Sequence, residues 1–188
     1  MIIAITGNKF CGKSTVAELL HEELGWPVVS FAHKLKQITC ILSGCTMDEL
    51  EDYNFKETQL VPSYLFPYCS ANGAPTYRNF LQTFGTKVMR GYNNDVWIES
   101  MFHDIPECVI VSDCRFLNEA EEIIARNGII IRVERPSISS NDSHVSEQEM
   151  KDIDADVIIY NDCSIDELRD NIRCFIHDML EGTISKEY

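Results

Sequence analysis

Residues 7–14 of this 188-residue chain read Gly7-Asn8-Lys9-Phe10-Cys11-Gly12-Lys13-Ser14, and they are the strongest indication of its fold. It matches the pattern GxxxxGK[ST] and lies between an apolar run at 1–6 and a helical pattern at 14–24. The unbroken, β-branched run predicts a strand buried on both faces. The second segment predicts a helix because its apolar residues recur at helical spacing and Gly25 follows as a C-terminal cap. A strand, this loop and a helix in that order predict a phosphate-binding P-loop.

The loop has the chemistry to bind ATP. Its glycines let backbone N–H groups converge on phosphate oxygens, and the helix N-terminus adds a partial positive charge. Lys13 is expected to reach the β- and γ-phosphates, and the Ser14 hydroxyl to help hold Mg²⁺. A chance glycine-rich turn is the alternative, against which the flanking strand and helix argue. The expected ATP-binding residues are Gly7, Asn8, Lys9, Phe10, Cys11, Gly12, Lys13, Ser14 and Thr15.

Strand and helix patterns alternate along the rest of the chain. Further strands are expected at 27–31, 108–112, 128–133 and 157–160, and further helices at 34–42, 77–90, 119–126 and 165–180. This alternation predicts one α/β domain over 1–188, with a five-stranded parallel sheet flanked by helices in three layers.

Two segments depart from the alternation. Residues from about 44 to 76 show little periodicity and are interleaved with prolines and aromatics, so we expect an irregular insertion on the acceptor side. A loop packed for stability alone is an equally open interpretation. Residues 137–146 are polar and turn-rich, which predicts a mobile loop and, over about 135–147, a lid.

The composition of the chain indicates which kinds of partner it can bind and in which cellular compartment it is expected. A net charge of −14 argues against sequence-independent nucleic-acid binding, which needs a broad cationic surface. The start of the chain lacks a basic n-region, and no apolar run is long enough to span a membrane. The eight cysteines are scattered, without a CxxC pair or zinc-like spacing. We therefore expect reduced thiols, a cytoplasmic protein and no membrane partner.

A carboxylate and several cations are candidates for the rest of an active site. Asp113 ends the apolar strand at 108–112, where a carboxylate of a doubly wound sheet faces the ligand crevice and orients Mg²⁺. A turn or helix-cap role for Asp113 is the alternative. Transfer between two phosphates needs several fixed cations, although each candidate alone is more often a surface charge. These candidates are Lys36, Arg78, Arg90, Arg115, Arg132 and Arg135, the last positioned to act over the transferring group.

These residues resemble the deoxynucleoside monophosphate kinases of phages and large DNA viruses over nearly the whole chain. Beyond the P-loop, the resemblance rests on residues 31–36 (FAHKLK), 78–86 (RNFLQTFGT), 113–120 (DCRFLNEA), 142–147 (DSHVSE) and 157–162 (VIIYND). The arginine block 78–86 and the aspartate–arginine block 113–120 are far more specific than the P-loop. His33-Lys34 and Leu117 depart from the family pattern, so Lys34 competes with Lys36 for a phosphate role.

The resemblance implies a P-loop fold of the nucleoside monophosphate kinase type, with a lid. It also implies ATP- and Mg²⁺-dependent phosphorylation of deoxynucleoside monophosphates. Catalysis would rest on Lys13, Asp113, Arg115 and Arg135, with Ser14 and Asp113 on the metal. Acceptor-binding residues would be Lys36, Arg78, Arg90, Arg115, Asn118 and Glu119, the last two orienting the loop behind Arg115. A homodimer in the cytoplasm of an infected host, or in a viral factory, is the expectation by analogy.

Two other readings stay open at this point. A phosphomevalonate-kinase-like enzyme has a related strand-end Asp-x-Arg arrangement and a similar lid. A P-loop switch protein that hydrolyses ATP slowly is the second, although convergent arginines argue for an acceptor anion. Aromatics near the acceptor residues would stack on a base or, at helical spacing, simply belong to the core: Tyr77, Phe80, Phe84 and Trp97.

Overall fold

The computed structural model describes residues 1–65, 74–137 and 145–188, and the chain divides into two compact units. Unit 1 comprises Met1–Ser30 and Asp104–Tyr188, and unit 2 comprises Phe31–His103. Within the described residues, no helix has the length and apolar character needed to cross a membrane.

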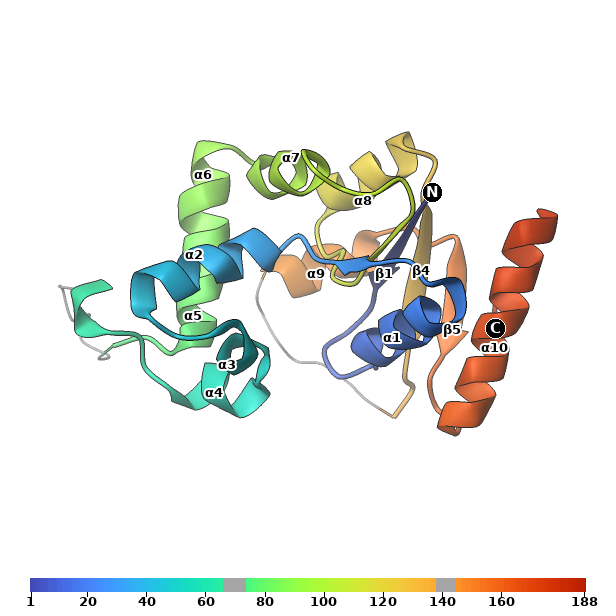
Figure 1. Ribbon diagram of the computed structural model, residues 1–188, viewed down its shortest axis with the longest axis horizontal. Coiled ribbons are helices and arrows are strands. Elements are labelled where there is room, and N and C mark those ends of the chain that lie inside the picture. Colours follow the sequence, from blue (N-terminus) through green and yellow to red (C-terminus); the bar gives the residue numbers. More distant parts are fainter. Residues whose placement is uncertain (66–73, 138–144) are drawn as a thin grey trace. The chain divides into compact units, whose positions relative to one another are not determined.

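Unit 1 is built on a parallel sheet of five strands in the order β2-β3-β1-β4-β5. Figure 1 labels β1, β4 and β5 of this sheet. The strands are β1 Ile2–Thr6, β2 Val28–Val29, β3 Val109–Val111, β4 Ile129–Glu134 and β5 Val157–Tyr160. β1 lies at the centre and every one of its residues is buried, as its unbroken apolar sequence predicts. The predicted five-stranded parallel sheet is therefore confirmed, although the second strand is shorter than the expected 27–31.

Helices cover both faces of this sheet and make the unit three layers thick. They are α1 Lys13–Leu24, α8 Leu117–Ala125, α9 Val145–Asp152 and α10 Ile165–Glu181. α1 and α10 pack against each other, and their apolar residues form one core cluster with alternate residues of β1, β4 and β5. α8 packs on β1 and β4 with α9 beside it. Gly25 ends α1 in a left-handed conformation, as the sequence predicts.

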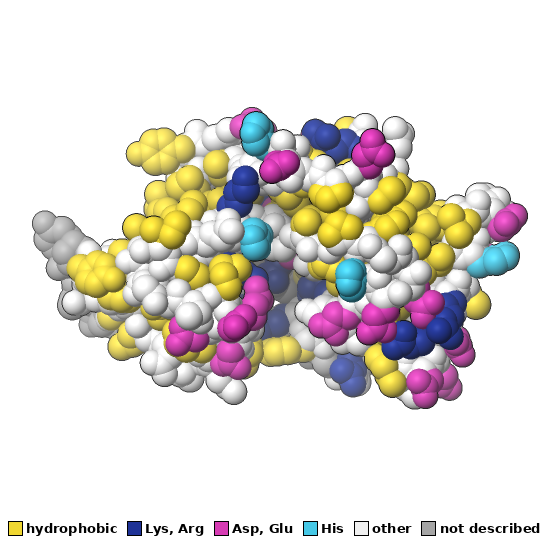
Figure 2. Space-filling view, viewed as in Figure 1, with side chains coloured by type: hydrophobic (Ala, Val, Ile, Leu, Met, Phe, Trp, Pro, Cys, Tyr) yellow, Lys and Arg dark blue, Asp and Glu magenta, His cyan; other side chains and the backbone are white. Residues whose placement is uncertain are grey.

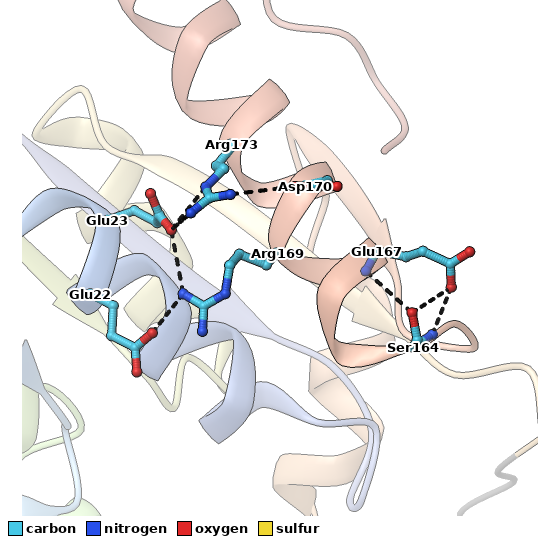
Figure 3. Close-up of polar contacts among 7 residues, drawn as sticks. All are labelled: Glu22, Glu23, Ser164, Glu167, Arg169, Asp170 and Arg173. Atoms are coloured by element: carbon cyan, nitrogen blue, oxygen red, sulfur yellow. Dashed lines mark hydrogen bonds and ion pairs between the residues drawn. The ribbon is translucent and has the colours of Figure 1, made fainter.

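The outer surface of α1 and α10 carries a cluster of ion pairs, which Figure 2 shows as basic side chains surrounded by acidic ones. Arg169 Nη1 lies 2.7 Å from Glu22 Oε2, and Arg173 Nη2 lies 2.9 Å from Glu23 Oε1 (Figure 3). Ser164 and Glu167 cap the start of α10 with reciprocal hydrogen bonds. The ion pairs of Arg169 and Arg173 join the first and last helices of unit 1.

In the described residues of unit 2, the regular elements are all helices, and one isolated antiparallel bridge joins Leu60 and Thr76. These elements are α2 His33–Ser43, α3 Met47–Glu51, α4 Tyr53–Thr58, the 3₁₀ turn Ser63–Leu65, α5 Tyr77–Gln82, the π-helix Thr83–Met89, α6 Arg90–Tyr92 and α7 Val96–Phe102. Leu50, Val61, Tyr77 and Phe80 form its core. The indole Nε1 of Trp97 donates to the Gly85 carbonyl at 3.0 Å, which ties α7 to the π-helix.

The expectation of irregular structure across 44–76 is wrong for its first part, because α3 and α4 occupy residues 47–58. Both helices are too short to show a hydrophobic period, and N-terminal caps define them instead. Thr46 and Glu49 form a capping box, and Asp52 accepts from the Phe55 N–H. α7, α9 and the π-helix inside the predicted helix at 77–90 are also absent from the elements that the sequence predicts.

Candidate active site

The loop between β1 and α1 has the backbone of a phosphate cradle. Gly7 and Gly12 have φ angles of 140° and 100°, and Phe10 also takes a positive φ of 68°. A Cβ on Gly7 would lie 2.4 Å from the Val133 carbonyl oxygen, so the loop passes β4 too closely for any side chain. Both positions therefore need the positive φ that glycine adopts, and Gly7 also needs the absence of a side chain.

Lys13 and Ser14 open α1 from this loop. The Lys13 Nζ donates to the carbonyls of Gly7 at 2.6 Å and Asn8 at 2.7 Å, so the ammonium lies against its own loop. Ser14, one residue further along the helix, is exposed. Backbone N–H groups at a helix N-terminus beside a lysine suit a polyphosphate.

Asp113 lies beside the strand that enters the phosphate loop. The Cys114 N–H donates to the Ile5 carbonyl at 3.1 Å, and the Ser112 N–H donates to the Val29 carbonyl at 3.0 Å. The backbone on either side of Asp113 is therefore held between the ends of β1 and β2. That position fits the expected role at the carboxyl edge of the sheet.

The oxygen donors of Asp113 and Ser14 fit Mg²⁺, which proteins usually hold through one or two side chains plus substrate phosphates and water. Across residues 1–65, 74–137 and 145–188, no group of three or more His, Cys, Asp or Glu side chains gathers to hold a metal ion. A magnesium ion here would therefore depend on phosphate oxygens for the rest of its coordination.

Two carboxylates hold the backbone of the Arg115 loop. Glu119 is only 3% exposed, and its Oε2 accepts from the N–H groups of Arg115 at 2.8 Å and Phe116 at 3.1 Å. The next N–H, that of Leu117, donates to Glu149 of α9 at 3.3 Å. Three successive N–H groups are thus satisfied by carboxylates, which orients the loop that carries Arg115.

Cys114 lies between the two charged residues of this segment and is fully buried. Burial raises the pKa of its thiol well above the ordinary value, and the nearby carboxylates of Glu119 and Asp113 raise this pKa further. The thiol therefore stays protonated at neutral pH and serves as a packing group.

The expected acceptor cations of unit 2 each have a carboxylate or carbonyl partner. Lys36 on α2 lies 2.5 Å from Glu51, and Arg78 on α5 lies 3.2 Å from Glu57. Arg90 is buried and donates to the Asn94 carbonyl at 2.8 Å. Their binding of an acceptor phosphate stays a prediction, as does the choice of Lys36 over Lys34.

Arg132, another of the candidate cations, makes a structural contact, and a phosphate role for it stays a prediction. Its guanidinium donates to the carbonyls of Met150 and Ile153 and so caps the end of α9. Arg135, after β4, is exposed. Most of the expected lid lies outside the described residues.

The aromatics near the acceptor residues belong to the core of unit 2. Tyr77, Phe80 and Trp97 are buried, and Phe84 stacks on Phe80 with ring centroids 5.4 Å apart. Asn161 is a contact of the phosphate loop that the sequence motifs do not indicate, and its Nδ2 donates to the Cys11 carbonyl at 2.8 Å. Its place directly after the strand at 157–160 was the available signal.

The seven cysteines in the described part of the chain are free.

Comparison with solved structures places the fold among P-loop kinases. The chain matches shikimate kinase from Aquifex aeolicus with a TM-score of 0.53, at 14% identity, over 97% of this chain and 99% of that one. A shikimate kinase from Acinetobacter baumannii matches with a TM-score of 0.50 and 15% identity, over 98% and 95% of the two chains. At these identities the likeness establishes the fold alone.

Sequence comparison identifies the family more specifically than the solved structures do. A putative deoxynucleotide monophosphate kinase from Acanthamoeba polyphaga mimivirus is 31% identical over 189 residues, covering 92% of this chain and 94% of that protein. The deoxynucleotide monophosphate kinase of Enterobacteria phage T4 is 29% identical over 104 residues, covering 51% and 43% of the two. The family model described as deoxynucleotide monophosphate kinase matches residues 68–172. With its phosphate loop and Asp-x-Arg segment in a P-loop kinase fold, this chain belongs to the deoxynucleotide monophosphate kinase family.

Proposed function

We propose that this chain transfers the γ-phosphoryl group of ATP to a deoxynucleoside monophosphate, giving the diphosphate and ADP. The main evidence for this proposal is that a chain of this family has an intact phosphate loop together with an Arg115 loop whose backbone is held by the buried Glu119 carboxylate. Transfer between two phosphates brings more negative charge together than one bound nucleotide carries, so a cation in addition to Lys13 suits this reaction. The prepared arginine supports a reaction in which a second phosphate is present.

The ATP half of the reaction is assigned to unit 1. Backbone N–H groups from Gly7 to Ser14 would bind the β- and γ-phosphates, and Lys13 would exchange its loop carbonyls for phosphate oxygens. Ser14 and Asp113 would hold Mg²⁺, which when bound neutralises phosphate charge during transfer. Arg115 would contact the transferring group from a backbone that Glu119 and Glu149 hold in place.

The acceptor is assigned to cations that recognise a monophosphate. Arg78 is the foremost candidate in unit 2, because a guanidinium binds phosphate oxygens in a bidentate manner. On binding the acceptor, Arg78 would exchange its carboxylate partner Glu57 for the phosphate. Lys36, Arg90 and Asn118 are further candidates, and Arg135 is assigned to the transferring group. An acceptor oxygen then attacks the γ-phosphorus in line, and no covalent enzyme intermediate is required.

The test is an ADP-release assay with ATP, Mg²⁺ and a panel of deoxynucleoside and ribonucleoside monophosphates, with phosphomevalonate as a comparison acceptor. We expect ADP release that depends on one or more deoxynucleoside monophosphates and a matching diphosphate product on chromatography. The Lys13→Ala variant is the control for contaminating kinases. ATP consumption that is independent of every acceptor would refute the proposal, and turnover with phosphomevalonate alone would replace it.

A further inference from the structure

Asn161 connects the end of the last strand to the phosphate loop. It follows β5 directly, and its backbone N–H donates to the Glu134 carbonyl at the end of β4, at 2.7 Å. The side-chain Nδ2 donates to the Cys11 carbonyl at 2.8 Å, across 150 residues of sequence. The amide is therefore anchored in the sheet and reaches into the loop.

The same amide packs against the second glycine of the motif. A Cβ placed on Gly12 would lie 2.0 Å from the Asn161 Nδ2, a separation that real Cβ atoms do not show. Gly12 is thus required for contact with Asn161 as well as for its φ of 100°. The Asn161 side chain therefore makes a hydrogen bond to Cys11 and a close packing contact with the next loop residue, Gly12.

Peptide geometry couples the Cys11 carbonyl to the Gly12 N–H. The Cys11 carbonyl and the Gly12 N–H belong to one planar trans peptide unit, so they point in opposite directions. When Asn161 holds the carbonyl toward β5, it turns the Gly12 N–H away from β5. Because the N–H is already oriented, it needs little reorganisation when a phosphate binds.

We propose that Asn161 is a positioning residue of the ATP site, which fixes the Cys11–Gly12 peptide so that its N–H is aimed at the phosphates. The inference rests on the proposed binding of ATP by this loop, and it does not depend on which acceptor is used. Lys13 holds the Gly7 and Asn8 carbonyls of the loop, and Asn161 holds Cys11 from the sheet.

The experiment compares Asn161→Leu and Asn161→Ala with a matched control. Leucine has the size and shape of asparagine without the N–H donor, and alanine also removes the packing. Asp156→Ala is the control, because Asp156 makes an equivalent tether at the opposite end of β5, accepting from the Ile130 N–H at 2.8 Å. ADP binding is measured by calorimetry, and the KM values for ATP and for the acceptor by steady-state kinetics. All measurements are made at a temperature where circular dichroism shows each variant folded.

We expect both Asn161 variants to bind ADP about tenfold more weakly and to raise the KM for ATP similarly, the loss that one oriented hydrogen bond carries. The KM for the monophosphate should stay within about twofold of wild type, because the loop does not hold the acceptor. Asp156→Ala should lower the melting temperature while leaving the ADP affinity within about twofold.

Wild-type ADP affinity in a folded Asn161→Leu would overturn the inference, as would an equal loss of affinity in Asp156→Ala. If no monophosphate is phosphorylated but ADP affinity still falls selectively in the Asn161 variants, the acceptor proposal fails and this inference stands. Absence of ADP and ATP binding by the wild-type chain would refute both.

Discussion

Replacement of Glu119 by alanine tests how the Arg115 loop is supported. Glu119 is buried, and one of its oxygens accepts from two backbone N–H groups, those of Arg115 and Phe116. Alanine removes this acceptor from both N–H groups, which lie in a partly buried loop. Hydrogen bonds to a charged acceptor contribute about 1.5–3 kcal/mol each, and the lower figure applies because one oxygen is shared. The expected loss of stability is therefore about 3 kcal/mol.

The isosteric variant Glu119→Gln separates hydrogen bonding from charge. Its amide oxygen can still accept from both N–H groups, so we expect a loss of only about 1 kcal/mol, the difference between charged and neutral acceptors. Glu122→Ala on the same helix is the control. Glu122 forms only a partly exposed pair with Arg126, and its removal should cost about 0.5 kcal/mol or less.

Urea denaturation at neutral pH measures these stabilities, and steady-state kinetics measure the catalytic effect. Because Arg115 loses its support, Glu119→Ala should reduce kcat by about tenfold under conditions where the variant is folded, and Glu119→Gln should recover most of that activity. If Glu119→Ala costs no more stability than Glu122→Ala, the hydrogen-bond argument is wrong. If stability falls by the expected amount but kcat is unchanged, Glu119 does not act through Arg115.

Three further perturbations examine other parts of the molecule. Lys13→Ala should lower kcat by about a hundredfold or more without unfolding the chain, and near-normal turnover would refute the phosphate-loop assignment. Arg78→Ala should raise the acceptor KM by about ten- to a hundredfold with ATP binding unchanged, whereas an equal effect on both substrates, or on neither, would assign Arg78 to its pairing with Glu57 alone. The hydrogen bond from Arg173 lowers the pKa of Glu23, so the carboxylate stabilises the fold above its unfolded pKa of about 4.3 and loses that contribution as the pH falls through the lower folded value. The stability difference between wild type and Glu23→Gln in urea melts should therefore shrink as the pH falls from about 6 to about 3, and a constant difference would contradict the pairing.

Local sequence was sufficient for the parts of this protein that depend on short-range chemistry. The glycines and Lys13 of the phosphate loop, the buried β1 and the helix after the loop all follow from residues within one turn or strand of one another. The same holds for the capped ends of α1 and α10, where Gly25 and Ser164 act through neighbouring backbone groups. Alternation of such elements was enough to predict a five-stranded parallel sheet, because buried parallel strands and amphipathic helices carry distinct periodicities.

The contacts between residues far apart in the chain are set by the tertiary structure. No local pattern indicates that Glu149 reaches the Leu117 N–H or that Arg132 caps the far end of α9. Likewise Asn161 meets Cys11 only because β5 and β1 flank β4 in the sheet, so that their carboxyl ends share one edge. A backbone N–H or carbonyl is present at every residue and carries no sequence signature. Which side chain satisfies it is therefore set by the packing of strands and helices, and the partners of the loops around Lys13 and Arg115 emerge only with the folded chain.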